Sequence, residues 1–223
     1  MTLPRRAEAV IFDMDGLLVD TEVLARDAMM AAAHDLGCDL PLPVFLSMVG
    51  RNQASSDEIL REHFRDEVVL ARFKVDWLER FHAVDAAEIR LKAGVVELLD
   101  HLDALGLPRA VCTSSPHASV QRQLGPSGIA GRFDAVIARG DYQEGKPHPE
   151  PYLKAAAALG ADPVACLALE DSHNGVRAAH AAGMMTIMVP DLLDPTEEIR
   201  GLCVRIAATL HEVPALLGEG AAR

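Results

Sequence analysis

The chain has 223 residues, of which 50% are hydrophobic and 24% are charged, and its formal net charge is −12. This length and composition predict one domain with an insertion, or two modest domains, around a sizeable buried core. An acidic surface repels nucleic acid and anionic membranes, so neither is expected as a partner.

The N-terminal segment and the cysteines bear on the cellular compartment. Arg5 and Arg6 precede an apolar stretch, as in a signal peptide, but the stretch is short and ends at Asp13. No apolar run approaches the length that spans a bilayer. The four cysteines form no C-x-x-C pair, which argues against a zinc site. We therefore expect a soluble, cytoplasmic protein.

The first 92 residues predict one strand followed by helices. The run AVIFD at 9–13 is β-branched and aromatic, which predicts a buried strand. The helical spacing of apolar residues then predicts three helices, at 21–36, 55–63 and 66–82. Ser55 and Glu58 fit a capping box at the start of the second helix, and Pro41 and Pro43 predict a loop before it.

From residue 94 onward, predicted helices alternate with predicted strands. The helices cover 94–105, 116–124, 150–159 and 174–182. The strands cover 109–113, 134–138, 165–169 and 185–189. This alternation predicts an α/β fold with a doubly wound parallel sheet. We therefore predict a core of residues 1–19 and 93–223, with an α-helical cap inserted at 20–92.

Polar side chains follow three of the predicted strands. Asp13, Thr113 and the Glu170-Asp171 pair each come directly after a hydrophobic run. Because the carboxyl ends of parallel strands share one edge of the sheet, where ligands bind, these residues are expected to converge. Oxygen ligands of this kind suit Mg²⁺, and three carboxylates in a cleft without a cation would repel one another.

The same edge carries groups that suit a phosphate. Thr113 offers a hydroxyl, and the amides of Ser114 and Ser115 precede a helix whose N-terminus can bind an anion. Lys146, in the Gly/Pro-fixed segment GKPHP, could neutralise phosphate charge or hold a carboxylate nucleophile. Asp15 lies two residues after Asp13, near enough to act as a general acid and base while Asp13 forms a covalent aspartyl phosphate.

Four segments resemble the motifs of one superfamily. FDMDGLLVDTE resembles motif I of the haloacid dehalogenase-like (HAD) superfamily. AVCTSS resembles its Thr/Ser motif, GKPHPEPY its Lys motif, and LALEDSHNGVRAAHAAGM its acidic motif. The motifs occur in the order of the family across the whole chain, and the helical insertion after motif I resembles the cap of the β-phosphoglucomutase-like subgroup. The resemblance implies a Rossmann-like core, a Mg²⁺ cofactor and phosphoryl transfer.

The resemblance also implies a role for each motif residue. Asp13 would be the nucleophile and a Mg²⁺ ligand, and Asp15 would be the general acid and base, with a backbone carbonyl that also binds Mg²⁺. Thr113 and Ser114 would hold the transferring phosphoryl group. The remaining roles are charge neutralisation by Lys146 and completion of the Mg²⁺ site by Glu170 and Asp171.

Several reactions of this superfamily compete. Cleavage of a carbon–halogen bond needs no acid for the halide, so Asp15 argues against a dehalogenase. A β-phosphoglucomutase-like mutase stays possible, but Gln53 occupies the place of its cap arginine and 21–30 lacks its histidine. The residues of motif I, and the segment MVPD at 188–191, most resemble those of pseudouridine-5′-phosphatases and of sugar- or polyol-phosphate phosphatases. A phosphatase of a small phosphorylated metabolite (a sugar, polyol or nucleoside phosphate) is therefore the first choice.

Two cap residues and one alternative class complete the predictions. Arg51 follows Gly50 in a predicted cap loop, where it could meet the substrate's remote groups or stay solvated, and Glu22 near the hinge is a weaker candidate.

Receiver domains also combine an Asp, a Thr/Ser, a Lys and an acidic pair. Their acidic pair precedes the acceptor strand and they lack a large helical insertion, so the order here opposes that alternative. The sequence carries no signal for an oligomeric state.

Overall fold

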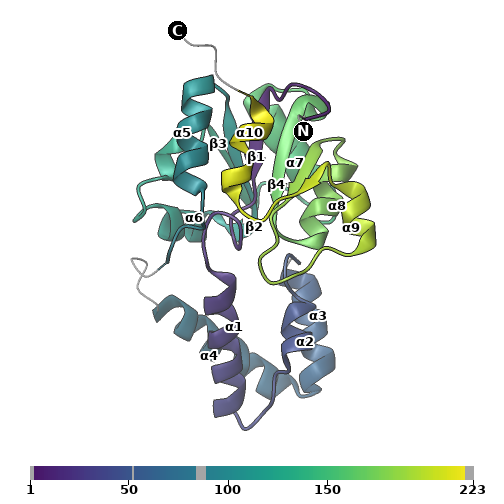
Figure 1. The fold of residues 1–223 in the computed structure, drawn as a ribbon. Coiled ribbons are helices and arrows are strands. Elements are labelled where there is room, and N and C mark those ends of the chain that lie inside the picture. The colour runs from purple at the N-terminus through teal and green to yellow at the C-terminus, as the bar shows by residue number, and fades with distance from the viewer. Residues whose placement is uncertain (1–2, 52, 84–88, 219–223) are drawn as a thin grey trace.

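The computed structural model describes residues 3–51, 53–83 and 89–218, and within them six strands form one parallel sheet (Figure 1). The order across the sheet is β3-β2-β1-β4-β5-β6. In chain order the strands are β1 (Ala9–Phe12), β2 (Arg109–Pro116), β3 (Ala135–Arg139), β4 (Cys166–Glu170), β5 (Met185–Met188) and β6 (Arg205–Ile206). The doubly wound α/β fold is thereby confirmed, with β1 in the middle of the sheet.

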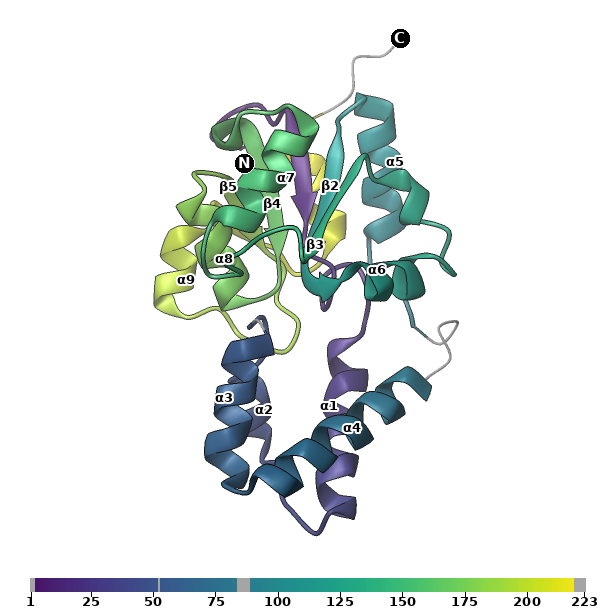
Figure 2. The same ribbon diagram turned by 180° about the vertical axis from the view of Figure 1, so that it is seen from behind.

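Helices cover both faces of this sheet, as the two opposite views in Figures 1 and 2 show. They are α5 (Val95–Leu105), α6 (His117–Leu124), α7 (Glu150–Leu159), α8 (His173–Ala181), α9 (Glu197–Leu202) and α10 (Pro214–Leu217). Along β1, Val10 and Phe12 pack on the side of α5 and α6, whereas Ala9 and Ile11 pack on the side of α7 and α8. A strand that is buried on both faces reads as a continuous apolar run, which explains AVIF.

Four further helices form a separate group beyond the edge of the sheet where the strands end (Figure 2). They are α1 (Glu22–Asp35), α2 (Leu42–Leu46), α3 (Gln53–Phe64) and α4 (Glu67–Ala83). Their apolar faces enclose a core of their own, which includes Met29, Phe45, Leu60 and Phe73. An amphipathic helix is stabilised mainly by burying its apolar face, so these helices depend on one another.

Two chain segments connect this helical group to the sheet and run side by side. The amide of Asp20 donates to the carbonyl of Arg90 at 2.9 Å, and the amide of Lys92 donates to the carbonyl of Leu18 at 3.0 Å. These paired segments lie at the predicted boundaries of the cap. The division of the chain into two domains at these boundaries stays a prediction. Among the described residues, no helix combines the length and apolarity that a membrane span requires.

Three local predictions were wrong. Helix α2 forms where Pro41 and Pro43 predicted only a loop, because a proline is tolerated in the first turn of a helix, where its missing N–H has no intrahelical partner. Helix α3 begins at Gln53, so Ser55 lies inside it and does not begin a capping box. The chain also forms α9 and the two-residue strand β6 after residue 190, where no element was predicted.

Candidate active site

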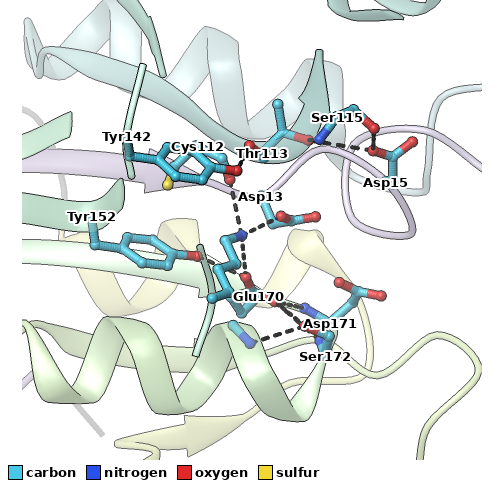
Figure 3. Close-up of polar contacts among 12 residues, drawn as sticks. Asp13, Asp15, Cys112, Thr113, Ser115, Tyr142, Tyr152, Glu170, Asp171 and Ser172 are labelled. Atoms are coloured by element: carbon cyan, nitrogen blue, oxygen red, sulfur yellow. Dashed lines mark hydrogen bonds and ion pairs between the residues drawn. The ribbon is translucent and has the colours of Figure 1, made fainter. Parts of the chain in front are cut away.

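A pocket of about 460 Å³ lies between the carboxyl ends of the strands and the helical group α1–α4. Asp13, Asp15, Thr113, Lys146 and Asp171 all line it. They come from the ends of β1, β2 and β4 and from the loop before α7, so residues far apart in sequence meet as the parallel sheet predicts (Figure 3).

Lys146 lies at the centre of the polar contacts and is buried, with 2% of its surface exposed. Its Nζ donates to Asp13 Oδ1 at 2.5 Å, to Glu170 Oε1 at 2.6 Å and to the carbonyl of Cys112 at 3.0 Å (Figure 3). The ammonium group also lies 4.9 Å from the centroid of the Tyr152 ring. An ammonium group has three hydrogens, so these three acceptors fix its position completely.

Glu170 is fully buried and both of its carboxylate oxygens are engaged. Its Oε1 accepts from Lys146 and, at 2.8 Å, from the hydroxyl of Tyr152. Its Oε2 accepts from the backbone amides of Asp171 and Ser172, at 3.0 and 3.1 Å, and from Ser172 Oγ at 3.0 Å. A Cβ on Gly175 would lie 1.7 Å from Glu170 Oε1, so only glycine fits there. Glu170 therefore holds Lys146, and its oxygens have little capacity left for a metal ion.

Asp13 and Asp171 are the carboxylates best placed to hold a cation. One oxygen each of Asp13, Glu170 and Asp171 lies within 4.8 Å of the others. Burial raises the pKa of Asp13 to about 8, with Glu170 and Asp15 adding to the effect and Lys146 opposing it. Burial, then Asp13 and Glu170, raise the pKa of Asp171 well above its ordinary value. This excess of buried negative charge beside oxygen donors fits a divalent cation such as Mg²⁺.

Asp15 is held among hydroxyl groups, close to Ser115 (Figure 3). Its Oδ1 accepts from Thr21 Oγ1 at 2.8 Å, and its Oδ2 accepts from Ser115 Oγ at 2.8 Å and from Thr113 Oγ1 at 3.4 Å. Thr113 Oγ1 in turn accepts from the amide of Ser115 at 3.0 Å. The carboxylate of Asp15 is thus oriented beside the end of β2, which leads directly into α6, and Ser114 of that strand also lines the pocket.

The two candidate residues in the cap, Glu22 and Arg51, also line the pocket. Glu22 is the first residue of α1, and burial raises its pKa to about 8, with further contributions from Asp15, Asp13 and Asp191. Arg51 donates from Nε to the carbonyl of Ser47 at 2.7 Å. Their contact with a substrate stays a prediction.

The sequence model of the haloacid dehalogenase-like hydrolases matches residues 7–183 of the chain. The chain belongs to this family. Hexitol phosphatase B of Escherichia coli (strain K12) is 34% identical over 200 residues, which cover 85% of this chain and 86% of that protein. The family match and the name of this relative support the predicted class of enzyme, a phosphatase.

Two solved structures extend the comparison with the HAD family. The crystal structure of CbbY from Rhodobacter sphaeroides in complex with phosphate has a TM-score of 0.78 and 29% identity, and the match covers 93% of this chain and 96% of that one. The β-phosphoglucomutase of Clostridium difficile has a TM-score of 0.76 at 23% identity, covering 93% of each chain. These likenesses confirm the predicted fold.

Sequence reasoning missed several residues of this HAD site. Tyr152 and Ser172 bind Glu170, and Thr21 binds Asp15, but nothing in the surrounding sequence indicates these contacts. Asp191 could have been found, because it follows β5 at the same edge of the sheet. Its Oδ1 accepts from Lys92 Nζ at 2.7 Å.

Proposed function

We propose that the chain is a Mg²⁺-dependent phosphatase that hydrolyses a small phosphorylated metabolite through an aspartyl phosphate on Asp13. One observation carries the proposal. Asp13 accepts a hydrogen bond from the buried ammonium group of Lys146, and one of its carboxylate oxygens lies within 4.8 Å of an oxygen of Asp171. The carboxylate of Asp15, oriented by Ser115, lines the same pocket. This arrangement supplies a nucleophile, a fixed cation, a place for a second cation and a proton carrier within one pocket.

The proposed reaction has two displacements at phosphorus. A carboxylate oxygen of Asp13 attacks the phosphorus atom and the bond to the leaving oxygen breaks, while Asp15 gives that oxygen a proton. Asp15 then removes a proton from water, the water oxygen attacks phosphorus, and the Asp13–phosphorus bond breaks to release inorganic phosphate. Lys146 fixes the attacking carboxylate, and Thr113 with the Ser114 amide holds the phosphoryl oxygens.

Asp13, Asp171 and the backbone carbonyl of Asp15 would hold the Mg²⁺ ion. When bound, the ion neutralises the charge of the phosphoryl oxygens. We assign Glu170 to Lys146 and not to the metal, because both of its oxygens already accept hydrogen bonds.

The proposed function is tested on a panel of sugar, polyol and nucleoside monophosphates, followed by phosphorus NMR with Mg²⁺ and with excess EDTA. We expect inorganic phosphate to accumulate from at least one substrate with Mg²⁺ and not with EDTA. An isomeric sugar phosphate that forms without inorganic phosphate would show a mutase instead. Undiminished turnover in EDTA would contradict the metal requirement.

Replacing Asp15 with asparagine is expected to lower kcat by about 10²- to 10⁴-fold for metabolite phosphates, because the leaving oxygen then receives no proton. The loss in kcat/KM, which reports the first displacement, should be much smaller for para-nitrophenyl phosphate, whose leaving group is stable as an anion. kcat should fall for both substrates, because Asp15 also removes the proton from water in the second displacement. Steady-state kinetics on both substrates measures these values, and equal losses of kcat/KM would mean that Asp15 does not protonate the leaving oxygen.

Gly50 offers a test of the contact between its own loop in the cap and the segment of Asp171 and Ser172 after β4. It has φ +70°, and a Cβ there would lie 2.4 Å from Cβ and Oγ of Ser172, next to Asp171. Gly50→Ala is therefore expected to displace this loop and to lower kcat/KM by about 10- to 100-fold. Gly37→Ala is the matched control, because Gly37 has φ +69° but nothing within 4 Å of the added Cβ. Equal kcat/KM values in the two variants would show that the contact between Gly50 and Ser172 does not matter for activity.

A further inference from the structure

The end of β3 contributes a cation to the pocket, Arg139. Arg139 is paired in the sheet with Pro116, which lies three residues after Thr113 in β2. Its side chain reaches the first residue of α3, where Nη1 donates to Gln53 Oε1 at 3.0 Å. Gln53 lines the pocket as well. Arg139 therefore extends from the sheet to the cap along one wall of the pocket.

The orientation of Gln53 is set by neighbouring side chains of the cap. Gln53 Nε2 donates to Asp57 Oδ1 at 3.2 Å, one turn further along α3. The other oxygen of Asp57 forms an ion pair with Lys74 Nζ of α4 at 2.8 Å. Because Asp57 occupies the amide nitrogen, the amide oxygen is the atom that faces Arg139. Gln53 is neutral, so it holds the guanidinium group in place and leaves its charge intact.

No carboxylate neutralises Arg139 within the part of the chain that the structure describes, where its hydrogen bond to Gln53 is its one polar contact. The chain has 33 acidic and 21 basic residues, so carboxylates are abundant. Arg132, Arg177 and Arg205 each pair with one. Arg139 is exposed and lines the pocket, and four of its five N–H donors stay open to a ligand.

The chemistry and the place of Arg139 define the ligand group that it fits. A guanidinium group binds a carboxylate or a phosphate through two parallel hydrogen bonds, which favours these anions over a neutral hydroxyl group. Three residues separate Thr113 from Pro116, which is about 10 Å in a strand. A ligand whose phosphate lies at Thr113 therefore reaches Arg139 only when several carbon atoms separate its two ends.

We propose that Arg139 determines specificity for phosphate monoesters whose leaving group carries a second anionic group, a carboxylate or another phosphate, at about the length of a hexose chain. The transferring phosphoryl group lies at Asp13, and the second anion accepts hydrogen bonds from Arg139, which Gln53 positions. The inference rests on the proposed phosphatase function and adds a charge requirement to its substrate.

The test compares two substrates that differ only at the far end of the chain. Sorbitol 6-phosphate ends there in a hydroxymethyl group and gluconate 6-phosphate in a carboxylate. With wild-type enzyme and Mg²⁺, we expect kcat/KM to be at least about tenfold higher for gluconate 6-phosphate. Equal values, or a preference for sorbitol 6-phosphate, would overturn the inference. No hydrolysis of any ester, including para-nitrophenyl phosphate, would overturn the phosphatase proposal itself.

Sorbitol 1,6-bisphosphate distinguishes the two kinds of second anion. A kcat/KM above that of gluconate 6-phosphate would support the inference with a phosphate as the preferred anion, and a lower value that still exceeds that of sorbitol 6-phosphate would support it with a carboxylate. Added KCl should reduce the preference for either anion, because salt screens the interaction between exposed charges. A preference that is independent of KCl would contradict recognition by charge.

Variants of the Arg139–Gln53 pair supply the second arm. Arg139→Met removes the charge and should lower kcat/KM for gluconate 6-phosphate at least about tenfold more than for sorbitol 6-phosphate. Gln53→Glu gives Arg139 a carboxylate partner of the same shape and should reduce the same preference. Arg200→Met, at an exposed arginine of α9 outside the pocket, is the matched control and should keep the preference. Equal losses on both substrates in Arg139→Met, or a preference that survives in both pocket variants, would overturn the inference.

Discussion

Replacing Asp13 with asparagine is expected to lower kcat for any phosphate monoester by about 10⁴-fold or more, because a neutral amide cannot attack phosphorus as a carboxylate does. The amide has the same shape, so the pocket should keep its geometry. Burial raises the pKa of Asp13 to about 8, which means that the ionised carboxylate is unfavourable in the fold. The variant should therefore have a Tm no lower than that of the metal-free wild type.

Kinetics and thermal unfolding together check this expectation. Asp39→Asn is the control, because Asp39 is an exposed carboxylate outside the pocket, and it should change neither kcat nor Tm appreciably. A marked fall in the Tm of Asp13→Asn would show that the Asp13–Lys146 contact stabilises the fold more than the burial of charge opposes it. Substantial residual turnover would show that a different residue attacks.

Replacing Lys146 with methionine is expected to destabilise the fold by about 3–5 kcal/mol, because it leaves buried carboxylates without their cation. Lys146 contacts both Asp13 and Glu170, and nothing else in the described chain donates to Asp13 from a side chain. Without Lys146 the pKa of Asp13, already about 8, should rise further, since Lys146 is what lowers it. Up to about pH 8 both proteins lose stability in parallel as pH rises, because Asp13 stays protonated in the fold and ionises on unfolding. Above about pH 8 only the variant continues to lose stability, so the deficit should grow from about pH 8 upward.

Urea unfolding across this pH range, without added metal, measures the deficit. Tyr152→Phe is a milder variant, which removes only the hydroxyl donor to Glu170 and should cost about 1 kcal/mol. Lys154→Met is the matched lysine control, because Lys154 is a largely exposed residue of α7 and its ion pair with Glu150 should contribute little. A loss of less than 1 kcal/mol in Lys146→Met, or a deficit that shrinks as pH rises, would contradict the electrostatic account.

The parts of the fold that were predicted from sequence are those with clear local patterns. The strands β1 to β5 contain apolar runs, and each was found within a few residues of its place. Strand β6 has two residues, one of them Arg205, so it has no apolar run to recognise. Helix α2 was missed because Pro43 was interpreted as a breaker, although it occupies the first turn of the helix.

The candidate site was predictable to the extent that it follows from strand ends. Asp13, Thr113 and Asp171 meet because parallel strands end at one edge, which is a property of the fold class. The direction in which Glu170 points depends on Tyr152, Ser172 and the space above Gly175, and these contacts leave no local trace in the sequence.

The most direct test of the proposed mechanism is to trap the covalent intermediate. The enzyme with Mg²⁺ is mixed with a hydrolysed substrate, quenched in acid during the first turnover, and reduced with borohydride, which converts an acyl phosphate of aspartate to homoserine. Mass spectrometry of the peptides then locates the modified residue. The account predicts homoserine at position 13 in the wild type and none in Asp13→Asn. Modification of another residue, or none while phosphate is being released, would contradict it.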